Sequence, residues 1–117
     1  MPHVVLDGPV DISGFCRAYR PVTQHHPGGI LKLQTAYVGI DGTEVLIEAI
    51  SVEDGPPVRF LVQILCRGDR TTVKVYPGTD PEKTDGVKKI IALTARMLKE
   101  CSPGVRYGTT NLGGFLL

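Results

Sequence analysis

Tight-turn sequences divide the middle of the chain into short apolar runs, and this division constrains the fold more than any other feature. Asp41-Gly42 and Asp54-Gly55-Pro56-Pro57 are both strong turn signals. They separate three segments, 31–37, 45–52 and 58–66, in which apolar residues alternate or run continuously. Each segment predicts a strand. The last has apolar residues on both faces, which is typical of a central strand covered on both sides.

Two helices are predicted, one before and one after these strands in the sequence. The first extends from Asp11, a capping residue, to about His26, and Pro21 is expected to kink or end it. The second opens at Thr79-Asp80-Pro81-Glu82 with Thr79 or Asp80 as the cap, and ends at Ser102-Pro103-Gly104. Its apolar stripe has helical spacing and comprises Val87, Ile90, Ile91, Thr94, Ala95 and Leu98.

Strands are also predicted at residues 2–6 and 105–109, and residues 71–76 form a short strand or an extended arm. The order of elements predicts one domain over residues 1–117, of α/β or α+β class, with both helices on one face of the sheet. The opposite face needs cover, and association into an oligomer is one way to supply it.

Composition excludes several classes of function. The net charge is only +1, tryptophan is absent and aromatic residues make up 6%, which disfavours a nucleic-acid-binding surface. There is no apolar run long enough to span a membrane and no basic leader, so we expect a cytoplasmic protein. Three widely separated cysteines disfavour both a disulfide framework and a structural zinc site. His3 and the adjacent His25-His26 pair lack an accompanying carboxylate cluster, so no metal site is expected.

The opening Met1-Pro2-His3, followed by an apolar strand, resembles the start of the tautomerase superfamily, and most closely its 5-carboxymethyl-2-hydroxymuconate isomerase group. Residues 12–21, with an internal glycine and proline, are similar to the first helix of that group. Residues 54–64 resemble its long central strand, and residues 87–98 fall where its second helix belongs. The resemblance implies a β-α-β unit repeated twice, with two helices on a four-stranded or larger mixed sheet, and a homotrimer.

The resemblance also implies an activity, a cofactor-independent isomerisation of an unsaturated keto or enol acid. Removal of Met1 would leave Pro2 as a free secondary amine, and an amine kept neutral by an apolar, cationic pocket can move a proton next to a carbonyl. Lys32 and Arg70 match positions at which that group carries cations for the substrate's carboxylate.

Other interpretations remain open at each of these positions. A proline at the first position of a strand loses no ladder hydrogen bond, so Pro2 has a purely structural explanation. Lys32 and Arg70 equally suit solvated surface charges. The alternative functions are a non-catalytic oligomeric subunit of the same fold, which binds or supports a partner, and a hydratase that uses Pro2 as an acid.

Overall fold

Seven strands and two α-helices make up the computed structural model, which describes residues 1–116. The elements follow one another as β1 (His3–Asp7), α1 (Ile12–Ala18), β2 (Val22–His26), β3 (Gly29–Val38), β4 (Glu44–Val52), β5 (Val58–Arg67), β6 (Arg70–Val75), α2 (Asp85–Cys101) and β7 (Arg106–Thr110), with a 3₁₀ turn, η1, at Gly113–Phe115. The α+β class predicted from the sequence is confirmed.

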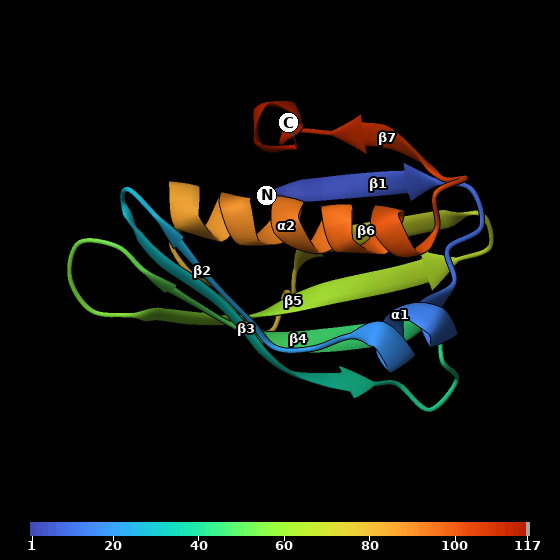
Figure 1. Cartoon of the computed structure of the whole chain (residues 1–117), viewed down its shortest axis with the longest axis horizontal. Coiled ribbons are helices and arrows are strands. Elements are labelled where there is room, and N and C mark those ends of the chain that lie inside the picture. The colour runs from blue at the N-terminus through green and yellow to red at the C-terminus, as the bar shows by residue number, and fades with distance from the viewer. Residues whose placement is uncertain (117) are drawn as a thin grey trace.

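All seven strands form one sheet in the order β2-β3-β4-β5-β6-β1-β7 (Figure 1). Hairpins connect β2 through β6 in sequence, and β1 lies beyond them, between β6 and β7. Every neighbouring pair of strands in residues 1–116 is antiparallel, so the predicted mixed pairing is wrong.

The topology also departs from a twofold β-α-β repeat. Strands β6 and β7 both run antiparallel to β1, so they are parallel to each other, and α2 connects them as one β-α-β unit. The strands that α1 connects, β1 and β2, have four strands between them and are related by five successive antiparallel pairings. They therefore run in opposite directions and form no second unit.

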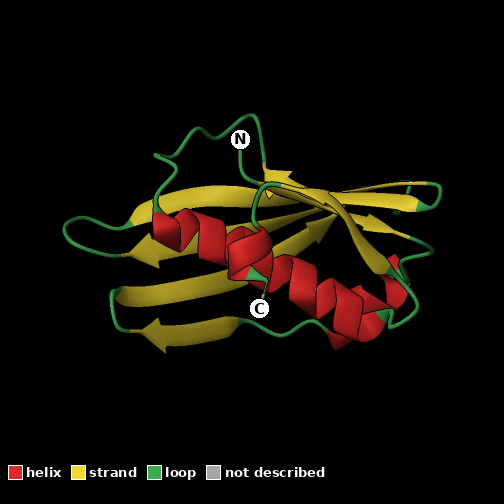
Figure 2. Cartoon of the chain, turned by 90° about the horizontal axis from the view of Figure 1, so that it is seen from above, coloured by secondary structure: helices red, strands yellow, loops and turns green. Residues whose placement is uncertain are grey.

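Both helices pack on the same face of the sheet, which we call the helix face (Figure 2). Side chains in register across four neighbouring strands, Val45, Ile64, Val73 and Val4, are fully buried there. The predicted stripe of α2 is confirmed, because all six of its side chains are buried against this face. On the other face, the open face, Leu61 and Leu65 of β5 are only half-buried while Gln63 between them is buried, so the described chain covers this face of β5 in part.

The first helix is shorter than predicted, and a strand replaces its second half. Asp11 caps α1 as expected by accepting a hydrogen bond from the Gly14 amide (2.9 Å). The helix ends at Ala18, because Tyr19, two residues before Pro21, has an extended ψ of 134° that does not continue the helix. The chain then forms β2, which turns through Pro27-Gly28 and pairs antiparallel with β3.

The second helix begins five residues later than the nearest predicted cap. Thr84 is its N-cap, and a carboxylate from another element completes the helix start. Glu53, just beyond β4, accepts hydrogen bonds from the Thr84 hydroxyl (2.6 Å) and the Gly86 amide (3.1 Å). Ser51 also donates to it (3.0 Å), so this one side chain joins the sheet to the helix.

Glu53 should make folding stability depend on pH. Burial alone raises the pKa of this carboxyl, but the hydrogen bonds from Thr84, Gly86 and Ser51 and the nearby charge of His26 hold the pKa below its ordinary value. Its stabilisation is therefore complete above the ordinary pKa and is lost as the pH falls through the folded-state pKa.

We expect Glu53→Gln to lower the free energy of unfolding by about 2 kcal/mol at neutral pH, as loss of a charged hydrogen-bonding partner does. The deficit should shrink in acid. Urea denaturation across the acidic range checks both statements. Glu48→Gln is the matched control, because among residues 1–116 the carboxylate of Glu48 accepts a single hydrogen bond, from the Tyr37 hydroxyl at 3.3 Å on the open face. An equal loss in both variants would contradict the role given to Glu53.

Candidate functional site

Pro2 is a buried residue immediately before β1, and the side chain of Asn111 holds the backbone on both sides of it. Asn111 donates from Nδ2 to the Met1 carbonyl (2.8 Å) and accepts the His3 amide at Oδ1 (3.0 Å). The His3 ring nitrogen Nδ1 also lies 3.0 Å from the Met1 carbonyl oxygen. The carbon of that carbonyl is bonded to the Pro2 nitrogen, so Asn111 and His3 place polar groups beside this nitrogen.

A cavity of about 250 Å³ opens at this point, lined by Met1, Pro2, Lys83, Lys88, Asn111 and Leu112. We call it the N-terminal pocket. The ammonium group of Lys83 is engaged by the Asp80 carboxylate (2.8 Å) and the Pro81 carbonyl (2.6 Å). The hydrogen bond from Lys83 and the charge of its ammonium group lower the pKa of Asp80. In residues 1–116 no carboxylate lies within ion-pair distance of Lys88, so this ammonium is the group available to an anion.

The cations predicted from the sequence lie elsewhere. Arg70 begins β6 opposite Asp7, at the end of β1 away from Pro2, and its Nε is 3.9 Å from the Asp7 carboxylate. Lys32 lies on the open face of β3, and three strands separate β3 from β1 in the sheet. The structure therefore brings neither side chain together with Pro2.

Arg70 lines a wide hollow of about 410 Å³ at that end of the sheet. Strand register aligns Arg67, Arg70, Asp7 and Arg106 across β5, β6, β1 and β7. Asp69 lies in the same hollow, so charges of both signs are present there. Such an exposed mixed cluster matches the solvated-charge interpretation of Arg70.

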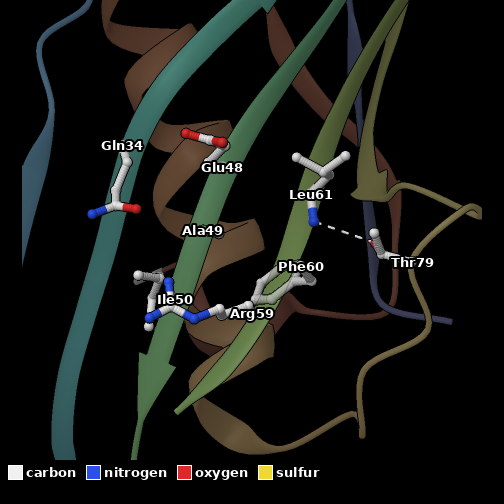
Figure 3. A pocket seen from close by; sticks show the side chains of 8 residues that line it. All are labelled: Gln34, Glu48, Ala49, Ile50, Arg59, Phe60, Leu61 and Thr79. Atoms are coloured by element: carbon white, nitrogen blue, oxygen red, sulfur yellow. Dashed lines mark hydrogen bonds between the residues drawn. The ribbon is translucent and has the colours of Figure 1, made fainter.

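Lys32 is next to a different hollow, shown in Figure 3, because it is in register with Ile50 and Ile50 in turn with Arg59. This cavity of about 240 Å³ crosses the open face of β3, β4 and β5, with Gln34, Glu48 and Arg59 on its rim. Thr79 closes one side by accepting the Leu61 amide (3.2 Å). Glu48 and Arg59 give it opposite charges, and the cavity is shallow for a selective anion site.

Sequence reasoning found Pro2 but missed Lys83, Lys88 and Asn111. Lys83 falls inside the predicted helix but precedes the real one, and Lys88 is an ordinary polar position on α2. Asn111 follows the last strand, where an isolated asparagine is a turn signal and nothing more.

No group of three or more potential metal-ligating side chains occurs within residues 1–116. Over the same part of the chain, no helix combines the length and apolar character needed to cross a membrane. Comparison with protein-family models, curated proteins and solved structures finds nothing that matches this chain.

Proposed function

We propose that this protein, once Met1 is removed, is a cofactor-independent isomerase in which the Pro2 nitrogen moves a proton on a small keto or enol carboxylic acid. The observation that carries the proposal is the placement of Pro2 in one cavity with Lys83, Lys88 and Asn111. The topology of the sheet does not contribute to the argument.

The pocket suits a neutral amine. A free α-amino group titrates near pH 8, and nearby ammonium groups disfavour its protonated form, which lowers the pKa further. A secondary amine in this position is then unprotonated in much of the population at neutral pH. It can accept a proton from an enol hydroxyl or an activated carbon and return it to another atom of the same substrate.

Asn111 and Lys88 supply the remaining functions. Asn111 donates to a carbonyl oxygen attached to Pro2. Removal of Met1 removes this acceptor and leaves the Nδ2 group able to polarise a substrate carbonyl at about the same position. Lys88, which has no ion pair in the described chain, would hold the substrate carboxylate, while Lys83 is already paired with Asp80.

The test combines a measurement of intact mass with a measurement of reaction rate. Intact mass of protein isolated from its native cells should lack the methionine, and the processed protein should accelerate ketonisation of enol-phenylpyruvate. Pro2→Ala should reduce the rate roughly a hundredfold, the loss expected for an essential proton-transfer group. Lys88→Met should mainly raise KM. Lys99→Met is the matched control, because Lys99 lies three turns further along α2, over the Tyr107 ring.

Retention of Met1, or full activity in Pro2→Ala, would contradict the proposal. Retention would favour the alternative of a non-catalytic oligomeric subunit, since the Met1 carbonyl is already tied down by Asn111. In that case the open face, where Tyr37 is about half exposed (53%), offers the contact surface. Light scattering would then be expected to give a trimer mass.

A further inference from the structure

A further cavity, of about 250 Å³, lies on the helix face between α2, β2, β3 and the C-terminal tail. We call it the β2–α2 pocket. Its lining includes Gln24, His26, Leu31, Lys89, Arg96 and Phe115. Leu31 and Phe115 give it apolar walls, and the other four side chains are polar or basic. No acidic side chain lines it within the described residues.

Lys89 and Arg96 reach this cavity from the same side of α2. They are seven residues apart, which is two turns with a difference of about 20° in direction. In residues 1–116 neither has a carboxylate within ion-pair distance. The nearby acid Glu53, whose charge interacts with His26, is already bonded to Ser51, Thr84 and Gly86. Within residues 1–116, the charges of Lys89 and Arg96 are therefore not neutralised by an ion pair.

His26 adds a donor to the same wall. Its Nδ1 faces two donors, the Gly28 amide (3.2 Å) and the Lys89 ammonium (3.4 Å), so Nδ1 must accept. In the neutral ring the proton then lies on Nε2. That nitrogen is buried and has no hydrogen-bond partner in the described chain. A buried donor without an acceptor is uncommon and calls for an explanation.

We propose that the β2–α2 pocket binds a small organic carboxylate with an apolar body, independently of the chemistry at Pro2. Arg96 presents the planar fork that matches a carboxylate, and Lys89 adds a second charge. His26 positions Lys89 through Nδ1 and offers Nε2–H to the same anion after a small adjustment. Leu31 and Phe115 contact the apolar body of the ligand.

The test is an NMR titration of the ¹⁵N-labelled full-length protein with three probes. Benzoate carries both recognition features, acetate carries only the carboxylate, and benzyl alcohol carries only the ring. We expect saturable shifts with benzoate at His26, Lys89 and Phe115, and much weaker binding of the other two probes.

Variants then assign the contacts. Arg96→Met should weaken benzoate binding at least about tenfold, as loss of a charged hydrogen-bonding partner does, and Arg96→Lys should lose less because it keeps the charge. Lys89→Met should also weaken binding. Lys99→Met, on the same helix but outside the pocket, should bind as the unaltered protein does. Melting temperatures confirm that each variant is folded.

Three results would overturn this proposal. They are no saturable benzoate binding at millimolar concentrations, unchanged affinity in both Arg96→Met and Lys89→Met, or shifts confined to Lys88 and Asn111. The last result would assign the carboxylate to the N-terminal pocket and leave the proposal for Pro2 standing. Loss of isomerase activity in Pro2→Ala leaves the β2–α2 pocket untouched, so the two proposals fail separately.

Discussion

Gly29→Ala should lower the free energy of unfolding by roughly 4 kcal/mol or more, at the upper end of what a single substitution does. Gly29 has a φ of +152°, which side-chain-bearing residues rarely adopt. A Cβ atom there would lie 1.8 Å from the Val52 carbonyl oxygen and 2.9 Å from its carbon. Both atoms belong to the backbone of the neighbouring strand β4, so no side-chain rotation can relieve the collision.

Two glycines provide matched controls for this experiment. Gly42 has a φ of +76° but nothing within 4 Å of its added Cβ, so Gly42→Ala isolates the backbone strain, which is about 1 kcal/mol. Gly104 has neither a positive φ nor a neighbour within 4 Å, and Gly104→Ala should be close to neutral. Urea midpoints with matched m-values provide the comparison. If Gly29→Ala costs no more than Gly42→Ala, the close approach of β3 to β4 is not as described.

The same substitution links the fold to the β2–α2 pocket. Gly29 is the β3 partner of His26, across the turn that places His26 against Lys89. Any shift of the β2–β3 hairpin away from β4 therefore moves His26. If a Gly29→Ala protein remains folded in a stabilising buffer, it should bind benzoate more weakly even though residue 29 does not line the cavity.

Local sequence patterns predicted those helices and strands that bury one face. The apolar stripe from Val87 to Leu98 predicted α2 because those side chains pack against the sheet. Apolar and polar residues alternate along β3, β4 and β5 because one side of each strand is packed. Strand β2 carries no such signal. It is an edge strand whose central residues, Thr23, Gln24 and His25, are exposed, so its sequence resembles the polar end of a helix.

The order of strands could not be predicted from these patterns. Hairpin signals determine which consecutive strands pair, and they account for β2 through β6. The insertion of β1 between β6 and β7 joins residues about a hundred positions apart, such as Val4 with Thr110, and no local feature specifies that pairing. The resemblance to a repeated β-α-β fold favoured a different arrangement.

The candidate site depends on that long-range pairing. Pro2 stands out in the sequence because of its position, but its neighbours come from the loop before α2, from α2 itself and from the tail after β7. They reach Pro2 only because β1 is flanked by β6 and β7. Lys32 and Arg70 were assigned by resemblance alone. The distance of Lys32 from Pro2 follows from the same strand order, and that of Arg70 follows from the register that places it opposite Asp7, at the far end of β1.

Gly86→Ala should be the second most damaging substitution, at roughly 3 kcal/mol, because it attacks the junction at Glu53. An added Cβ would lie 2.1 Å from the Ser51 hydroxyl and 2.8 Å from the Glu53 carboxylate. These are side-chain atoms that can move, unlike the Val52 backbone, but moving them breaks the hydrogen bonds that Glu53 accepts from Thr84 and Gly86. Alanine otherwise favours a helix over glycine by about 1 kcal/mol, so a loss here reports the collision alone.

A double-mutant cycle separates the collision from a general effect on α2. In a Glu53→Ala background the carboxylate that meets the new methyl group is gone, so adding Gly86→Ala should cost at least about 1 kcal/mol less than it does in the unaltered protein. Adding Ser51→Ala as well removes the closest contact, and the helix preference of alanine should then make the Gly86 change neutral or stabilising. Strictly additive losses in urea denaturation would mean that Gly86 and Glu53 are not in contact. The start of α2, and with it Lys88 beside Pro2, would then have to be held in place by other residues.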